Sequence, residues 1–347
     1  MQPTYRQESD RKNTLLLREI QKELPTFCAQ FFRGIEPQTT SLTRLNYAYD
    51  LRLFFRFLSD EFPRYDGRDP STFTIADVAA VEAVDLEIYL EYLTYYVRDE
   101  RGLENHESAK ERKLSSVRAL FKHLFKRELI AANVAALVEL PKKHEKPIVR
   151  LEPDEVAKLL DMAETGEGMT DRQKKSQLKT RTRDVALLTL FLSTGIRVSE
   201  CVGINLQDID FTVNGFAVTR KGGDRVILYF PDEAADALKE YIRERLEILP
   251  CQGHENALFL SIQRKRLNVR SVEYLVQRYA RVAAPLKKIS PHKLRSTFGT
   301  SLYQETGDIY LVADVLGHSD VNTTRKHYAA MSDEKRRMAA KSIKLRD

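Results

Sequence analysis

The apolar residues of the first 140 positions recur at the spacing of a helix face. Within 45–58, positions i, i+3, i+4 and i+7 are Leu51, Phe54, Phe55 and Leu58. Such a stripe predicts an amphipathic helix with one buried face. LEIYLEYLTYYV at 86–97 predicts another helix with Asp85 as its N-cap, and TLLLREIQKEL at 14–24 predicts one near the N-terminus.

The segment 109–127 combines an apolar stripe with a basic outer face. Its inner positions are Leu114, Val117, Leu120, Phe121 and Leu124. Its outer positions are Lys110, Arg112, Lys113, Arg118, Lys122 and Lys126. A basic helix over an apolar core suits contact with DNA phosphates, and it suits a solvated charged surface equally well. Both interpretations stay open from this segment alone.

A break in the pattern at 141–149, PKKHEKPIV, predicts a linker, because it has two prolines and no apolar periodicity. LEPDEVAKLL then predicts a helix with Pro153 in its first turn. The polar stretch 165–182 predicts a loop or mobile surface segment. The apolar run 185–194 predicts a buried helix that ends at Gly195.

The period then changes to that of strands. IDFTV and FAVTR flank Asn214-Gly215 and predict a tight hairpin, and RVILYF predicts a third strand. A further helix is expected from Asp232 to about residue 248. The predicted fold is mainly α with a small antiparallel sheet, in two domains: a helical one at 1–140 and an α+β one at 150–347.

Composition fits two globular domains and excludes a disordered chain, since 42% of the 347 residues are hydrophobic and 31% are charged. The net charge of +6 weakly favours a polyanionic partner. Cys28, Cys201 and Cys251 form no zinc-like spacing and predict buried thiols in a reducing compartment. With no signal-peptide pattern and no long apolar run, we expect a cytoplasmic protein without membrane association.

Four short stretches of the second half carry polar residues that suit work on a phosphate. They hold Arg197, Lys221, His292 with Arg295, and His318 with Tyr328. Each has a plain structural explanation by itself: an arginine that caps carbonyls or pairs with Glu200, a solvated hairpin lysine, a helix cap, and a half-buried tyrosine. His292 and Arg295 share a helix face near an N-terminus, which is already an anion site.

Together, these residues form a phosphate-clamping set with one oxygen nucleophile. Two arginines grip non-bridging oxygens of a phosphodiester and neutralise charge that grows in the transition state. We expect Tyr328 to attack phosphorus, His292 to accept its proton and His318 to hydrogen-bond the phosphate. We expect Lys221 to give a proton to the departing 5′-oxygen. No acidic metal cluster is visible, so neither metal nor cofactor is expected.

The motifs STGIRVSE (193–200), TRKGGDR (219–225), PHKLRST (291–297), LGHSD (316–320) and KHY (326–328) resemble those of the tyrosine recombinases, the integrase family that includes the Xer proteins. The resemblance covers about 150–335 and fills every catalytic position; Glu200 matches a supporting acid. Ser296 departs from the histidine that Xer proteins often have there. The N-terminal half resembles the family's core-binding (SAM-like) domain in layout only.

The resemblance implies a DNA clamp that forms a 3′-phosphotyrosine and exchanges strands through a Holliday junction in a homotetramer on a palindromic site. Residues 331–345 match a helix that docks on the neighbouring subunit, although docking on its own subunit or on DNA is also open. A DNA translocase or accessory factor is a further expected partner. Chromosome dimer resolution and mobile-element integration both fit, and the rivals are a topoisomerase-like or telomere-resolving enzyme and a non-catalytic DNA-binding regulator.

Overall fold

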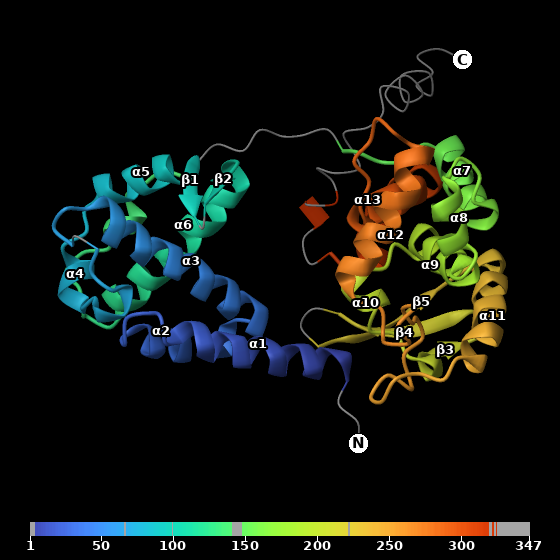
Figure 1. The fold of residues 1–347 in the computed structure, drawn as a ribbon, viewed down its shortest axis with the longest axis horizontal. Coiled ribbons are helices and arrows are strands. Elements are labelled where there is room, and N and C mark those ends of the chain that lie inside the picture. Colours follow the sequence, from blue (N-terminus) through green and yellow to red (C-terminus); the bar gives the residue numbers. More distant parts are fainter. Residues whose placement is uncertain are drawn as a thin grey trace, which may run out of the picture. The chain divides into compact units, whose positions relative to one another are not determined.

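The computed structural model describes residues 4–65, 67–98, 100–140, 148–220, 223–318, 321–322 and 324. The chain divides into two compact units, Met1–Lys146 and Pro147–Asp347. In Figure 1 the first unit is blue to green and the second is green to red. The division falls within the proline-containing segment 141–149, of which 141–147 lie outside the described residues. The predicted fold class is confirmed: both units are mainly helical with small antiparallel sheets.

The N-terminal unit is a helical bundle around an aromatic core. Its elements are α1 (Tyr5–Gln21), α2 (Cys28–Ile35), η1 (Glu36–Gln38), α3 (Ser41–Glu61), η2 (Pro70–Thr72), α4 (Ile75–Ala79), α5 (Ala83–Tyr92), β1 (Tyr95–Arg98), β2 (Arg101–Glu104), α6 (Glu107–Lys126) and η3 (Val134–Ala136). The predicted stripe of α3 is fully buried, and the ring of Tyr89 lies 5.2 Å from that of Phe54 and 4.9 Å from that of Phe57 between centroids. The apolar stripe of α6 is buried as well.

The helix predicted for 86–97 is wrong at both ends. It starts three residues earlier and stops at Tyr92, and its last residues form β1, which pairs antiparallel with β2. Consecutive aromatic and β-branched residues favour an extended backbone, and the neighbouring strand supplies the hydrogen bonds. Asp85 is not the N-cap; that position is Glu82, whose N–H donates to the Asp85 carboxylate at 3.0 Å. Arg64 also pairs with this carboxylate, at 2.5 Å.

The C-terminal unit surrounds one buried helix, α9. Its elements are α7 (Pro153–Thr165), α8 (Asp171–Gln177), α9 (Arg181–Thr194), α10 (Val198–Cys201), η4 (Leu206–Asp208), β3 (Ile209–Asp210), β4 (Gly215–Thr219), β5 (Arg225–Tyr229), α11 (Asp232–Glu247), α12 (Val269–Ala283), α13 (Pro291–Thr306) and α14 (Ile309–Leu316). Helix α9 packs against α7, α11 and α13, which explains its continuous apolar sequence. The strands form one antiparallel sheet in the order β3-β4-β5.

Most predicted elements of this unit are confirmed. The predicted hairpin is present, but its first strand is shorter and its turn longer than predicted. β3 ends at Asp210, residues 211–214 form the turn, in which Asn214 has φ +47°, and Gly215 already pairs with Asp210 as the first residue of β4. Phe216 pairs with Leu228 across β4 and β5. Gly195 ends α9 with φ +60°, as predicted, and a Cβ there would lie 2.4 Å from the Phe298 ring. Glycine is therefore required at this turn for both conformation and space.

The loop predicted for 165–182 is wrong over most of its length. Thr170 and Gln173 form a capping box that starts α8, and α9 already begins at Arg181. Gln177 is buried and donates to the carbonyl of Ala163 at the end of α7. A polar sequence thus forms helix here because its side chains satisfy backbone groups.

Two of the three cysteines lie in the cores of the units, as predicted for buried thiols. Cys28 and Cys201 are buried, and desolvation raises the pKa of both thiols, so neither is a reactive thiolate. Cys251 is half-buried. Among the described residues, no group of His, Cys, Asp and Glu side chains is arranged to hold a metal ion. Within the same residues, no helix has the length and hydrophobicity needed to cross a bilayer.

Candidate active site

The C-terminal end of α14 is bound by three arginines from separate segments. The last carbonyl groups of a helix lack partners within the helix and carry partial negative charge, so cationic donors stabilise them. Four consecutive carbonyls are used here. The donor and acceptor pairs are Arg220 with Asp314 (3.2 Å) and Val315 (2.8 Å), Arg295 with Leu316, and Arg197 with Gly317 (2.8 Å).

Arg197 lies in the loop between α9 and α10, where it is the N-cap of α10. The Glu200 carboxylate accepts from its backbone N–H at 3.1 Å and from its guanidinium at 2.9 Å. The structural explanation considered for Arg197, pairing with Glu200, is therefore realised. The Arg197 side chain can still contact a ligand, because 32% of it stays exposed. Glu200 thus orients a guanidinium that still reaches solvent.

Arg295 lies on α13 and is only 5% exposed. Its two terminal nitrogens donate to the carbonyls of Gly195 and Leu316, which belong to the turns that close α9 and α14. A buried arginine held by two carbonyls is a fixed positive charge. One turn earlier, His292 is exposed in the first turn of α13, and its carbonyl accepts from the Ser296 hydroxyl at 3.1 Å.

His318 follows the αL residue Gly317, which has φ +61°. Its backbone N–H donates to the carbonyl of Ala313 at 2.9 Å, and its Nδ1 lies 2.7 Å from the hydroxyl of Thr324. Thr324 is fully buried. Hydrogen bonds of both its backbone and its side chain therefore fix the position of His318. A histidine that acts on a substrate needs such a fixed orientation.

The structure brings together three of the six predicted catalytic residues, Arg197, Arg295 and His318, at the end of α14. His292 is placed on the same helix as Arg295. Lys221 and Tyr328 lie outside the described residues. Sequence reasoning missed Arg220 and Thr324; an arginine beside Lys221 was visible but looked ordinary, and nothing distinguished Thr324.

The basic residues of α6 fall into two groups. Arg112 pairs with the buried Asp50 at 2.5 Å, and Arg118 donates to the carbonyls of Ala135 (3.0 Å) and Val138. Lys110 donates to the hydroxyl of Thr94 at 2.6 Å, and burial lowers the pKa of Lys113, an effect that Asp50 opposes. Arg112, Lys122 and Lys126 are exposed, but Arg112 is engaged by Asp50, so the two lysines are the best placed to meet a ligand.

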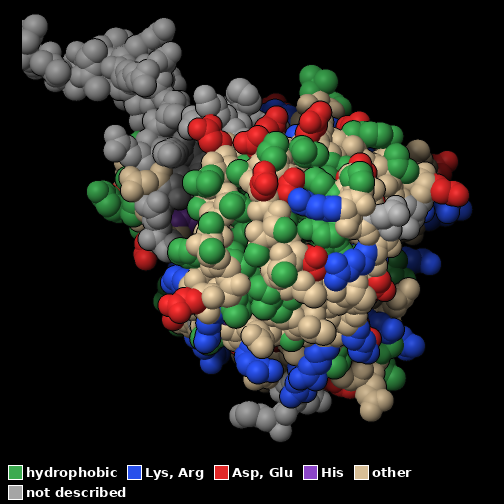
Figure 2. Space-filling view, turned by 90° about the vertical axis from the view of Figure 1, so that its left-hand side faces the viewer, with side chains coloured by type: hydrophobic (Ala, Val, Ile, Leu, Met, Phe, Trp, Pro, Cys, Tyr) green, Lys and Arg blue, Asp and Glu red, His purple; other side chains and the backbone are tan. Residues whose placement is uncertain are grey.

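On the face of the N-terminal unit drawn in Figure 2, Lys and Arg side chains gather in the lower part and Asp and Glu lie mostly above them. This uneven distribution is typical of a surface that meets a polyanion from one side.

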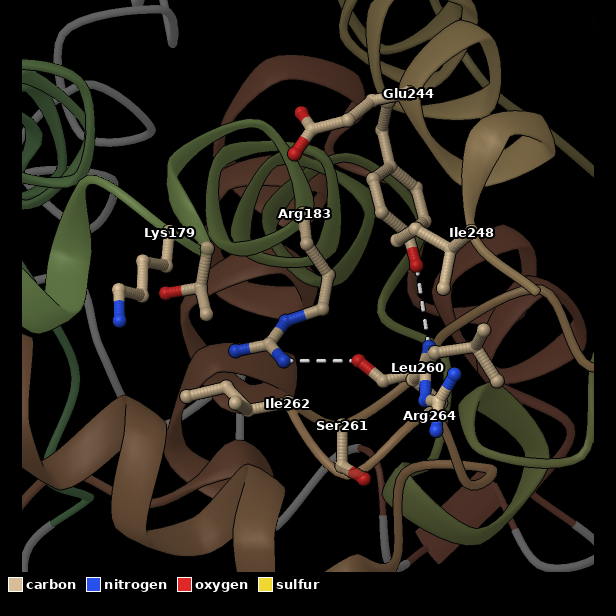
Figure 3. A pocket seen from close by; sticks show the side chains of 10 residues that line it. Lys179, Arg183, Glu244, Ile248, Leu260, Ser261, Ile262 and Arg264 are labelled. Carbon is tan, nitrogen blue, oxygen red and sulfur yellow. Dashed lines mark hydrogen bonds between the residues drawn. The ribbon is translucent and has the colours of Figure 1, made fainter. Parts of the chain in front are cut away.

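A separate pocket of about 220 Å³ lies between the start of α9, α11 and the loop around 260–264 (Figure 3). Arg183 donates to the carbonyl of Leu260 at 2.8 Å, and the backbone N–H of Leu260 donates to the Tyr241 hydroxyl at 3.1 Å. Arg197, Arg295 and His318 do not line this pocket. We therefore give it no part in the chemistry.

Comparison with known proteins defines the class to which this site belongs. The profile of the phage integrase family matches residues 149–335, more than half of the chain. "Tyrosine recombinase XerC" of Caldanaerobacter subterraneus subsp. tengcongensis is 35% identical over 291 residues, which cover 80% of this chain and 75% of the relative. The chain belongs to the tyrosine recombinases of the phage integrase family, and its activity is site-specific DNA recombination.

Solved structures show the same two-domain fold. The XerH recombinase bound to its difH substrate aligns with a TM-score of 0.62 at 22% identity, covering 88% of this chain and 80% of XerH. The Tn1549 transposon integrase in complex with circular intermediate DNA aligns with a TM-score of 0.64 at 20% identity, covering 90% of this chain and 98% of that one.

Proposed function

We propose that this recombinase cuts and rejoins double-stranded DNA by transesterification, with the Tyr328 hydroxyl as nucleophile. One observation carries the proposal: Arg197 and Arg295 bind the carbonyls of Gly317 and Leu316 at the end of α14, directly before His318, whose ring lies against the Thr324 hydroxyl. Donors fixed before the reaction stabilise developing charge without reorganising. A phosphodiester bound at the end of α14 lies next to these two guanidinium groups, whose positive charge stabilises the negative charge of its transition state.

The catalytic roles follow from the chemistry of each group. A guanidinium has five N–H donors, so Arg197 and Arg295 can bind non-bridging oxygens while they hold the carbonyls of α14. The Tyr328 oxygen bonds to phosphorus as the bond from phosphorus to the 5′-oxygen breaks. His292 takes the phenolic proton, Lys221 protonates the 5′-oxygen, and His318 donates to the phosphate. The 3′-phosphotyrosine preserves the ester, so rejoining needs no cofactor.

The proposed partner is a palindromic double-stranded site bound by four copies of the chain. The XerH and Tn1549 integrase structures, both DNA complexes of this fold, support DNA as the partner. In the N-terminal unit we assign phosphate contacts first to Lys122 and Lys126 of α6, because they are exposed. The exchange helix proposed for 331–345 lies outside the described residues.

For the biological role we propose chromosome dimer resolution in the cytoplasm, with a DNA translocase or accessory factor as a further partner. The XerC relative at 35% identity supports this role over the others. Integration of a mobile element is the second candidate, because the Tn1549 integrase shares the fold over 90% of this chain.

Capture of covalent protein–DNA adducts in the native host tests the function. Cells are lysed in denaturant, the protein is purified with its attached DNA, and the DNA ends are sequenced, with Tyr328→Phe as the matched control. We expect one short, roughly palindromic sequence from the wild type and none from the variant. A site near the replication terminus supports dimer resolution, and a site at the ends of an element supports integration. Adducts spread over many sequences would instead indicate a topoisomerase-like enzyme.

A further inference from the structure

The pocket between the start of α9, α11 and the loop around 260–264 is separate from the candidate active site (Figure 3). We propose that it is a docking site for an acidic peptide segment of a partner protein, which inserts one apolar side chain into the pocket. The inference goes beyond the proposed function and does not depend on it, because Arg197, Arg295 and His318 do not line the pocket.

The walls of the pocket are held by hydrogen bonds between distant segments. Arg183 donates to the carbonyl of Leu260 at 2.8 Å and pairs with the buried Asp184 at 2.6 Å. The hydroxyl of Tyr241 accepts from the backbone N–H of Leu260 and donates to the carbonyl of Leu258, both at 3.1 Å. A pocket formed in advance binds a ligand without the cost of ordering its own walls.

Apolar side chains form part of the lining and continue beside it. Ile248 and Leu260 line the pocket. Ile262 also lines it and is 63% exposed, whereas Leu178 and Leu249, each next to a lining residue in the chain, are 69% and 76% exposed. Exposed apolar side chains beside a concave site, with a polar rim, are typical of a protein interaction surface.

The rim of the pocket is basic. Lys179 and Arg264 lie on opposite sides of the pocket in Figure 3, and among the described residues neither side chain has a hydrogen-bond or ion-pair partner. The carboxylate of Glu244, the acid of the lining, accepts from the hydroxyl of Thr182. An apolar side chain with Asp or Glu on both sides of it therefore meets a cation at each side of the pocket.

The segment between α8 and α9 extends this positive charge. Residues 172–181 contain no acid, and their exposed basic side chains are Arg172, Lys174, Lys175, Lys179 and Arg181. Such a surface attracts an acidic ligand and speeds its association at low salt.

A partner protein fits this surface better than DNA or the tail of the chain does. Duplex DNA offers phosphates but no side chain to enter an apolar pocket. Residues 335–346 carry six Lys and Arg and no acid, so the basic rim repels them. The volume of about 220 Å³ is below the roughly 300–1,000 Å³ of small-molecule sites and suits one side chain of a peptide.

Binding of short labelled peptides to the full chain, measured by fluorescence anisotropy, tests the inference. Each peptide has photo-leucine at its centre, flanked by Asp and Glu in the probe, by Lys in one control and by Ser in another. We expect the acidic probe to bind at least about tenfold more tightly than both controls at low salt, and less tightly as salt is added. After illumination, mass spectrometry should locate the crosslink within 179–183, 244–248 or 260–264.

The double variant Lys179→Glu with Arg264→Glu should bind the acidic probe at least about tenfold more weakly, because like charges then face each other. Ile262→Asp should weaken binding to a similar extent. All three side chains are exposed, so we expect the unfolding temperatures to match the wild type.

Matched controls change the same properties away from the pocket. Lys158→Glu with Lys288→Glu changes the net charge equally at two exposed positions that do not line it. Leu286→Asp makes an apolar-to-acidic change at a 99%-exposed side chain. Both controls should bind the acidic probe within about twofold of the wild type.

Equal binding of the three peptides, a crosslink to other segments, or equal losses in the pocket variants and their controls overturns the inference. Weaker binding of duplex DNA by the Lys179→Glu with Arg264→Glu variant, without any preference for the acidic peptide, assigns the rim to DNA and also overturns it. Covalent adduct formation tests the proposed function separately: we expect the pocket variants to match the wild type, and no adduct from the wild type contradicts the proposed function alone.

Discussion

Arg197 donates to the carbonyl of Gly317 at 2.8 Å, although the two residues are 120 positions apart in the chain. This bond joins the loop after α9 to the residue directly before His318. Because Arg295 binds the preceding carbonyl, the positions of both arginines and of His318 depend on one short stretch of backbone. Changes to any member of this network should therefore alter cleavage more than DNA binding.

Replacing Arg295 by alanine removes a buried charge and leaves the carbonyls of Gly195 and Leu316 without this donor. We expect the cleavage rate to fall by about two to three orders of magnitude, the loss typical of one transition-state donor, with DNA affinity within a few-fold. Covalent adduct formation and gel-shift titration measure the two quantities. An unchanged cleavage rate would remove Arg295 from the active site.

Glu200→Gln tests whether the carboxylate positions Arg197. The amide keeps an acceptor oxygen but loses the charge that faces the guanidinium at 2.9 Å. We predict cleavage about tenfold slower and unfolding free energy lower by about 1 kcal/mol, typical of weakening a charge-assisted hydrogen bond. Equal cleavage by Glu200→Gln and wild type would show that Arg197 needs no carboxylate partner.

Thr324→Val removes the hydroxyl that lies 2.7 Å from Nδ1 of His318. We expect cleavage to slow by about tenfold with DNA binding unchanged, because the ring loses the hydrogen bond that orients it. Thr300→Val is the matched control: Thr300 is also buried, and among the described residues its hydroxyl has no hydrogen-bond partner. Similar activities of the two variants would exclude an orienting role for Thr324.

Gly195→Ala should destabilise the C-terminal unit by more than about 2 kcal/mol, since it combines φ +60° with a 2.4 Å approach to the Phe298 ring. Gly253→Ala measures the cost of the backbone conformation alone, because Gly253 has φ +84° and a Cβ there would meet no atom within 4 Å. Thermal unfolding compares them, and we expect the larger fall for Gly195→Ala. Equal falls would mean that packing at Phe298 contributes nothing.

The double variant Lys122→Gln with Lys126→Gln tests the DNA contacts of α6. If both lysines meet phosphates, the slope of log K against log salt becomes shallower by about 1.8, at about 0.9 for each contact. Arg118→Gln should instead lower stability, because its guanidinium binds carbonyls of Ala135 and Val138. An unchanged salt slope in the double variant would place the phosphate contacts elsewhere.

The sequence predicted elements whose pattern is governed by burial. The stripe of α3, the apolar run of α9 and the end of α9 at Gly195 could be predicted, because each follows from one local rule. Prediction from the sequence failed where contacts with other segments decide the local structure. The segment that follows Tyr92 becomes a strand because β2 pairs with it, and Asp85 serves an N-cap at Glu82 that its own sequence did not indicate.

In the candidate site, too, local motifs could be predicted from the sequence and tertiary contacts could not. Motif spacing was enough to name Arg197, Arg295 and His318, because each occupies a recognisable local motif. The bonds that unite them could not be predicted, since they end on backbone carbonyls of α14, which every residue type offers equally. Arg220 and Thr324 were missed for this reason: only the folded chain brings them to that helix end and to His318.

Mapping of the covalent attachment tests the central claim most directly. The captured adduct is digested with nuclease and trypsin, and mass spectrometry searches for a peptide that carries a nucleotide. Cleavage after Lys326 and Lys335 gives the peptide 327–335, HYAAMSDEK. We predict a 3′-linked nucleotide on Tyr328 in this peptide and its loss in Tyr328→Phe. A nucleotide on any other residue, or an adduct that persists in the variant, would contradict the account.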